Sequence, residues 1–206
     1  VDNLRELGIK VVVVKGPKSI ADVKENVKLI AKTLGEEDKG NLMIAKMDDK
    51  LAEIKEKVDN IKPEERKKLV LISLMISYGG KGCTFDDICK YAGVINGVSD
   101  AGLHNGQLLT KEMLVAINPD LLIMPVYNDH NTFDIEKYNK EFLDDPALQT
   151  LNAVKEKRFF YPREGYIYNS SQDIVFGVQE VARAAYGSLF DQPENCHISV
   201  VAEVEK

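Results

Sequence analysis

Three short polar stretches hold the side chains best suited to binding chemistry, and each of them follows a run of apolar residues. They span Tyr78 to Cys83, Tyr127 to Asn131 and Pro162 to Asn169. In a parallel sheet, ligands bind beyond the carboxyl ends of the strands, where such loops converge. The candidate ligand contacts are Tyr78 and Lys81 in the first stretch, Tyr127, Asn128 and His130 in the second, and Arg163, Tyr166 and Tyr168 in the third.

The third stretch combines a guanidinium with phenols. Arg163 can pair with a ligand carboxylate through two parallel hydrogen bonds. Tyr166 and Tyr168 alternate, so an extended segment would present both phenols on one side, and a phenolate can coordinate ferric iron. The alternative is that the rings cover the sheet edge and that the arginine is solvated.

The glycine-rich stretch around Lys81 precedes a predicted helix, whose first amides could bind an anion. It lacks the spacing of a phosphate loop or a dinucleotide fold, so a plain tight turn is the alternative. His104 lies between Gly102 and Gly106, and His130 lies in the second stretch; either could contact a ligand or simply face solvent. The histidines show no metal-ligand spacing, and we predict no metal site.

Composition narrows the function further. The 206 residues carry a net charge of −6, which argues against a nucleic-acid partner. We find no nucleophile elbow and no carboxylate pair among apolar neighbours, so no catalytic residues are predicted. Cys83, Cys89 and Cys196 are too few and too irregularly spaced for a disulfide framework or a zinc knuckle, which predicts ordinary thiols.

The elements that position these stretches begin with Ile9 to Val14, a β-branched run typical of a strand buried on both faces. Ser19 is expected to cap a helix that ends before Gly35. A longer helix runs from about Asn41 to Ile61 with its apolar residues on one stripe. This helix could cover one core, form a coiled-coil dimer, or act as a rigid strut between two lobes.

After Pro63, strands and helices alternate, which favours an α/β architecture of layers around a parallel sheet. Thr84 and Asp87 resemble a capping box, and Thr110 is expected to cap the helix that carries Glu112. The predicted elements are strands at Leu69 to Ser77, Leu121 to Val126 and Arg158 to Tyr161, and helices at Thr84 to Tyr91, Thr110 to Asn118, Phe133 to Lys157 and around Ile174 to Ala185.

The order of these segments resembles the helical-backbone (class III) solute-binding proteins of ABC importers, which serve ferric siderophores, haem and cobalamin. The resemblance covers Val1 to Gly187. Its most specific parts are AG-x-x-N at Ala92 to Asn96, the glutamate-led helix that runs into NPDLLI, and the sequence AVKEKRFFYP.

The resemblance implies two α/β lobes joined by one long helix, with ligand held between them. It assigns residues 1–38 to the remnant of a first lobe, 39–62 to the interlobe helix and 63–187 to the second lobe, and it leaves 188–206 as an unexplained tail. It adds Leu103 to Leu108, with His104 and Asn105 as candidate contacts, to the ligand-facing loops. It also matches Glu112 to a residue that docks on permease arginines. The alternative for Glu112 is a helix N-terminal glutamate favoured by the macrodipole.

The resemblance further implies an extracytoplasmic protein that is not an enzyme and has no intrinsic cofactor. Its partners would be a permease dimer and an iron chelate, haem or cobalamin. Most of the first lobe and the targeting signal are expected before Val1, which would leave Ile9 to Val14 as an exposed edge prone to self-association. The alternatives are a small doubly wound α/β enzyme with a nucleotide or metal site, and a scaffold or sensor on the same binding fold.

Overall fold

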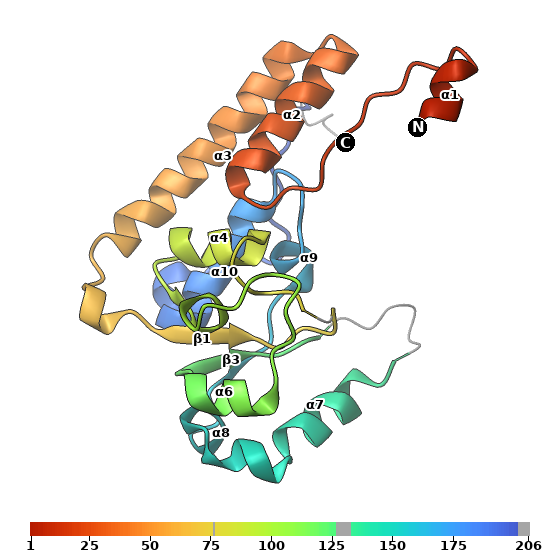
Figure 1. The fold of residues 1–206 in the computed structure, drawn as a ribbon. Coiled ribbons are helices and arrows are strands. Elements are labelled where there is room, and N and C mark those ends of the chain that lie inside the picture. The colour runs from red at the N-terminus through yellow and green to blue at the C-terminus, as the bar shows by residue number, and fades with distance from the viewer. Residues whose placement is uncertain (76, 127–132, 202–206) are drawn as a thin grey trace.

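A computed structural model of the protein describes residues 1–75, 77–126 and 133–201. Among these residues, a parallel four-stranded sheet in the order β2-β1-β3-β4 forms the centre of one α/β lobe (Figure 1). The strands are β1 (Lys68–Leu71), β2 (Ile95–Asn96), β3 (Leu121–Ile123) and β4 (Phe159–Phe160).

Alternate strand residues face two separate cores. Leu69 and Leu71 of β1 belong to one buried cluster, whereas Val70 belongs to the other. Because successive side chains point to opposite faces, both faces of the sheet are apolar and both are covered by helices. The predicted three-layer α/β lobe is therefore confirmed. The first face is covered by α4 (Thr84–Tyr91), α9 (Glu164–Ile167) and α10 (Ile174–Tyr186), and the second by α5 (Gly97–Asp100), α6 (Lys111–Ile117), α7 (Ile135–Leu143) and α8 (Asn152–Lys155). Short 3₁₀ turns lie at Pro63–Glu65, Pro146–Thr150 and Gly187–Phe190.

Two antiparallel helices, α2 (Ile20–Leu34) and α3 (Glu37–Val58), form a hairpin that projects from the lobe (Figure 1). The Ser19 hydroxyl accepts the amide of Asp22 at 3.1 Å, which confirms the predicted cap. Gly35 ends α2 in the left-handed region with φ of 69°, where a residue without Cβ is favoured. Before the hairpin, a single short helix, α1 (Asp2–Glu6), opens the chain.

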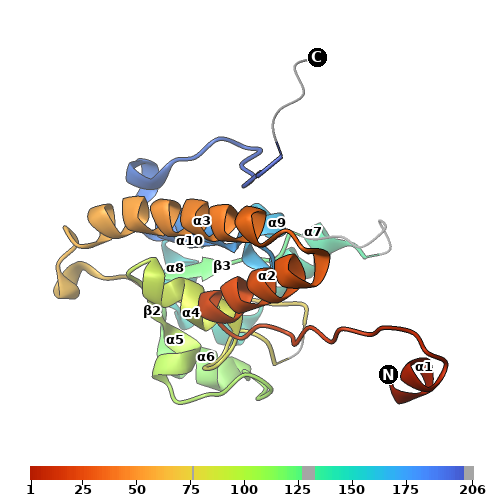
Figure 2. The same cartoon turned by 90° about the horizontal axis from the view of Figure 1, so that it is seen from above.

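The long helix α3 buries the predicted stripe, including Met47, Leu51, Ile54 and Val58. Its main contacts are with α2, α10 and α4, so it packs on helices of its own chain rather than flat on the sheet (Figure 2). The buried stripe is therefore not available for a coiled-coil dimer. Whether the helix also joins two lobes stays a prediction.

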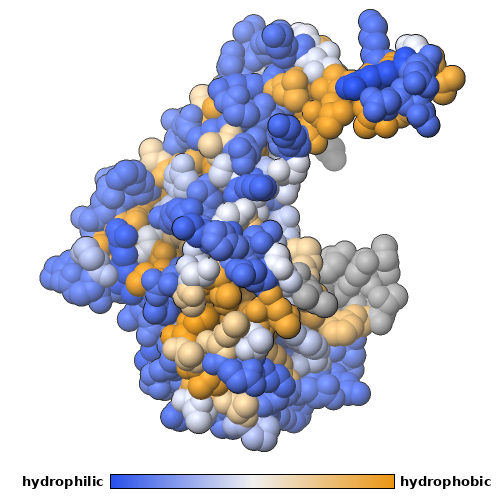
Figure 3. Space-filling model, viewed as in Figure 1, coloured by the Kyte–Doolittle hydropathy of each residue, from blue (hydrophilic) through white to orange (hydrophobic). Residues whose placement is uncertain are grey.

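The strand predicted at Ile9 to Val14 is wrong for this structure. The segment is extended, but no described residue pairs with it, and most of its side chains are exposed. A strand buried on both faces requires neighbouring strands and covering helices, which the described residues do not supply here. Figure 3 shows apolar atoms gathered where this segment passes the hairpin.

Other predicted elements are shorter in the structure or are divided. A strand ends where its pairing with a neighbouring strand ends. The predicted strand from Leu69 to Ser77 ends at Leu71, and the backbone turns away before Ser77, whose φ is 70°. The helical region at 133–157 is divided into α7, a 3₁₀ turn and α8. The strand-like run after Ile198 contains no strand in its described part, 198–201.

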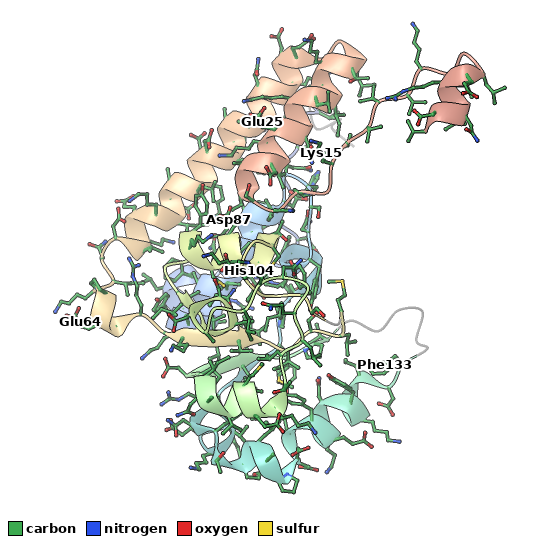
Figure 4. The ribbon with its side chains drawn as sticks, in the orientation of Figure 1. Lys15, Glu25, Glu64, Asp87, His104 and Phe133 are labelled. Atoms are coloured by element: carbon green, nitrogen blue, oxygen red, sulfur yellow. The ribbon has the colours of Figure 1, made fainter. Side chains whose placement is uncertain are left out.

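The capping box predicted at Thr84 and Asp87 is also wrong. Cys83 occupies the N-cap position of α4 without a side-chain cap, and the Thr84 hydroxyl instead lies 2.8 Å from that of Tyr78. The Asp87 carboxylate accepts the backbone amide of Ile20 at 2.8 Å, so it binds the start of α2 rather than its own helix (Figure 4). At α6 the Thr110 hydroxyl accepts the amide of Met113, and this cap is confirmed.

Candidate functional site

The carboxyl ends of β1, β3 and β4 meet at one edge of the sheet because the strands are parallel and adjacent. The structure describes the loop after β1 except for residue 76, the loop after β4 and the stretch at 103–108. Tyr127, Asn128 and His130 lie outside the described residues, so their predicted contacts stay predictions. Figure 3 shows a notch on this side of the molecule, between the projecting N-terminal segment and the lobe.

A pair of tyrosines from two of the predicted loops meets at this edge. The rings of Tyr78 and Tyr168 lie 5.5 Å apart between centroids and are tilted by 41°. The Tyr168 hydroxyl donates to Oγ of Ser73 at 3.3 Å, just after β1. Burial raises the pKa of the Tyr78 phenol, so this ring is a neutral hydrogen-bonding group rather than a phenolate.

Lys81, His104 and Asn105 are also brought together. The amide of Lys81 donates to the carbonyl of Leu103 at 2.9 Å, and the amide of Asn105 donates to that of Lys81 at 3.0 Å. A Cβ on Gly80 would lie 2.6 Å from the carbonyl carbon of His104, so glycine permits this close approach. The three side chains are exposed, and Figure 4 shows His104 on this loop.

The glycine-rich stretch is better explained as a turn than as an anion cradle. The Asp86 carboxylate lies in the first turn of α4, is buried, and accepts the amide of Gly82 at 3.4 Å. The Asn96 side-chain amide donates to Oδ1 of Asp86 and to the carbonyl of Gly79. A buried carboxylate already occupies this helix N-terminus, and it would repel a second anion.

A cavity of about 200 Å³ lies beside Tyr78 at the end of β1. Ser77 and Gln107 contribute its polar groups, while Tyr138 and Phe142 of α7 form part of its apolar wall. It is small beside typical ligand pockets of about 300 to 1,000 Å³, so it can hold only part of a larger ligand.

Arg163 and Tyr166 are not part of this cluster. The Arg163 guanidinium donates to Glu180 of α10, with Nη2 at 2.7 Å from Oε2. The Tyr166 hydroxyl lies 2.9 Å from the carbonyl oxygen of Cys196 in the tail. The predicted extended segment is instead the helix α9 followed by a turn at Tyr168, so Tyr166 and Tyr168 contact different neighbours.

Two residues of the tyrosine cluster were missed in the sequence, Ser73 and Thr84. Each hydroxyl contacts a tyrosine of the pair. Ser73 lies two residues beyond the end of β1, and this position at a strand end was the available signal. Thr84 was assigned to a helix cap because its spacing to Asp87 resembles one.

Glu112 lies exposed in the first turn of α6. Its own backbone amide and the Thr110 hydroxyl lower the pKa of its carboxyl, so it is negatively charged at neutral pH. This arrangement suits both the docking role and the macrodipole explanation.

The thiol prediction is confirmed: Cys83, Cys89 and Cys196 are all unpaired. Among the described residues, no three His, Cys, Asp or Glu side chains gather closely enough to hold a metal ion. Within the same part of the chain, each helix is too short or too polar to cross a bilayer.

Similar proteins share both sequence and fold with this chain. An uncharacterised ABC transporter substrate-binding lipoprotein of Bacillus subtilis, YvrC, is 25% identical in an alignment of 197 residues that covers 93% of this chain. The chain spans 59% of that relative's length.

Two solved structures resemble this one at low sequence identity, and they show the fold alone. The periplasmic haem-binding protein RhuT from Roseiflexus in its apo form superposes with a TM-score of 0.76 at 18% identity, covering 90% of this chain and 70% of that one. A possible iron-binding periplasmic solute-binding protein from Staphylococcus epidermidis gives a TM-score of 0.73 at 20% identity, covering 90% and 69%.

A family model described as periplasmic binding protein matches residues 2–164. This agrees with the resemblance carried by the sequence motifs. Because the match covers well over half of its residues, the chain belongs to the periplasmic binding protein family.

Proposed function

We propose that this chain forms part of the substrate-binding component of an ABC importer and that it works outside the cytoplasm. Its ligand is an iron complex, namely a ferric siderophore or haem, or else cobalamin. Family membership and the description of YvrC as an ABC transporter substrate-binding lipoprotein support the transport role. The descriptions of RhuT as haem-binding and of the Staphylococcus protein as possibly iron-binding support the ligand class.

The observation that carries the proposal is the Tyr78–Tyr168 pair, together with the exposed Lys81 on the same loop as Tyr78 and the exposed His104 and Asn105 on the stretch bonded to that loop. Aromatic faces stack on a flat macrocycle or a catecholate ring. Lysine pairs with ligand carboxylates, and an imidazole is an accepted axial ligand of haem iron. A surface that combines these groups suits a large chelate with an apolar body and charged edges.

Ligand binding is tested by absorbance titration and thermal shift with ferric haem, ferric hydroxamate and catecholate siderophores, and cyanocobalamin. Tyr168→Leu, which removes one ring of the pair, should weaken binding about tenfold, as expected for losing ~1.4 kcal/mol of stacking. Tyr91→Leu is the matched control because Tyr91 is an exposed tyrosine at the end of α4. If none of the ligands raises the melting temperature, the proposed ligand class is wrong.

We further propose that Glu112 docks on a basic residue of the permease dimer. Glu112→Ala should reduce ligand uptake in cells while leaving ligand affinity unchanged, because the exposed carboxylate would contact the permease rather than the ligand. Glu64→Ala removes another exposed glutamate, at the 3₁₀ turn before β1, and should leave uptake intact (Figure 4). Normal uptake by the Glu112 variant would show that Glu112 has no docking role.

If the unmodified protein binds ligand but supports no uptake, a sensor is favoured over a transport protein.

A further inference from the structure

The chain after α10 turns back and runs alongside α3 and α10 towards α9, which lies in the third predicted loop (Figures 1 and 2). Phe190 and Ile198 anchor it, since both are buried in the core on this face of the sheet. Between these anchors the segment has no regular structure, so its backbone groups are available to side chains. We call residues 192–199 the clasp.

Arg163 connects the clasp to the interior. Its backbone amide and guanidinium both donate to Glu180, whose side chain is fully buried on α10. The guanidinium also donates through Nη1 to the carbonyl of Pro193 at 2.7 Å. The Gln192 side-chain amide donates to Oε2 of Glu180 at 3.2 Å, so the clasp and Arg163 share one buried carboxylate.

Tyr166 makes the second connection. Its hydroxyl lies 2.9 and 3.1 Å from the carbonyl oxygens of Cys196 and Glu194, and its ring packs against Phe176. A Cβ on Gly177 would lie 2.4 Å from the carbonyl oxygen of Tyr166. The short helix α9 is thus seated directly on α10 on one side and is held by the clasp on the other.

The far end of the clasp reaches the long helix. The Asp173 carboxylate accepts the amide of Ile198 at 2.9 Å and lies 2.6 Å from Nδ1 of His197. On α3, the Lys46 ammonium donates to the carbonyl of Ser199 at 2.6 Å. The same segment therefore binds α9, the start of α10 and the middle of α3.

We propose that the clasp positions α9 so that Tyr168 meets Tyr78 at the candidate site, with Arg163 and Tyr166 acting as positioning residues. The inference rests on the proposed function in so far as it assigns Tyr168 to the ligand. Tyr168 follows Tyr166 by two residues, so a displacement of α9 moves it directly. The bonds from Arg163 and Tyr166 reach backbone carbonyls of the clasp, and they fix where the clasp lies without requiring particular side chains on it.

The position of Tyr168 can be read without any ligand. The chain contains no tryptophan, so Tyr168→Trp introduces a single tryptophan at this point, which can be excited at wavelengths that tyrosine does not absorb. In that background, removing all residues after Asp191 deletes the clasp but keeps the buried Phe190. The tryptophan emission should shift to longer wavelength and become easier to quench with acrylamide, because α9 loses its outer support.

Point variants show whether the change in fluorescence comes from losing the contacts of the clasp or from a general loss of structure. Tyr166→Phe removes one hydroxyl and should produce a smaller shift of the same sign. Tyr186→Phe is its control, since the Tyr186 hydroxyl also donates to a backbone carbonyl, that of Gly93, away from the clasp. A second control removes residues 202–206 alone. Circular dichroism melts show whether each variant is folded.

Ligand affinity gives the functional readout. In the chain with Tyr168 intact, Tyr166→Phe should weaken the binding of ferric haem about threefold to tenfold, whereas Tyr186→Phe should cost stability without this loss. Unchanged emission and quenching after clasp removal would overturn the proposal. If the unmodified chain binds no haem, the ligand assignment fails while the fluorescence still decides the role of the clasp.

Discussion

Glu180 is the residue at which Arg163, Arg183 and the clasp residue Gln192 meet. Its carboxylate is fully buried yet receives hydrogen bonds from Arg163, Arg183 and Gln192. Burial alone would raise the pKa of this carboxyl, but the hydrogen bonds and charges of the two arginines outweigh it, so the pKa lies below the ordinary value of 4.5. A carboxyl with a depressed folded-state pKa stabilises the protein above its unfolded pKa. That contribution is lost as the pH falls through the folded-state value.

The sign of this effect gives a prediction for Glu180→Gln. At pH 7 the variant should be less stable by about 2 to 3 kcal/mol, because two partly buried arginines lose their charged partner. The difference from the unmodified protein should shrink as the pH falls below about 4.5, the unfolded value. Urea unfolding followed by circular dichroism between pH 7 and pH 3 measures both quantities.

Glu64→Gln is the control for this experiment, since Glu64 is exposed and its replacement should leave stability within about 0.5 kcal/mol at every pH. A Glu180 variant whose deficit stays constant down to pH 3 would show that the carboxylate charge is not what holds this cluster.

At the scale of elements, the hairpin depends on the closeness of α2 and α3. Gly40 is buried in the first turns of α3, and a Cβ there would lie 2.4 Å from Cβ of Ala31 on α2. Replacing a helical glycine by alanine normally gains about 1 kcal/mol of helix propensity. Here the contact is with a β-carbon that cannot rotate away, and overpacking of this kind costs about 1 to 3 kcal/mol.

We therefore predict that Gly40→Ala lowers the stability of the protein by about 1 kcal/mol despite the better helix propensity. Asn41→Ala is the matched control, because Asn41 is the exposed neighbour and gains propensity without a clash. Its melting temperature should stay the same or rise. A Gly40 variant that is more stable than the unmodified chain would mean that the helices separate at little cost.

The sequence predicted α2 and α3 well because their apolar residues recur every three or four positions, a signal that lies within the helix itself. Strand lengths could not be read in the same way. The apolar run after Lys68 continues to Ile76, but β1 ends at Leu71, where pairing with β3 stops. Strand pairing depends on residues far away in the sequence, which an apolar run does not reveal.

The candidate site was predicted in part. That Tyr78 and Tyr168 meet follows from the rule that parallel strands end at one edge, although 90 positions separate them. The placement of Arg163 and Tyr166 was not predictable. Apart from the Glu180 carboxylate, their partners in the tail lie 28 to 30 residues further on, in a segment without periodicity, and those bonds go to backbone carbonyls that carry no sequence signal.

At the scale of the whole molecule, the segment at 9–14 exposes several apolar side chains close together in the sequence. Val12, Val13 and Val14 are consecutive in an extended chain and are each more than 40% exposed, so apolar side chains face solvent on both sides of it. Among the described residues, no backbone hydrogen bond involves Lys10 to Val14. An exposed extended segment with free amides and carbonyls is a template for pairing with another chain.

We predict that the chain self-associates through this segment, with strands of two copies pairing edge to edge. Val13→Lys should weaken the association about tenfold, because it places charges within a paired strand and removes apolar contact. Val201→Lys makes the same change at another exposed valine and should leave the association unchanged. Sedimentation velocity over a hundredfold range of concentration measures the dissociation constants. A chain that stays monomeric throughout this range would contradict the prediction, since the exposed valines and unpaired backbone would then be tolerated in solution without a partner.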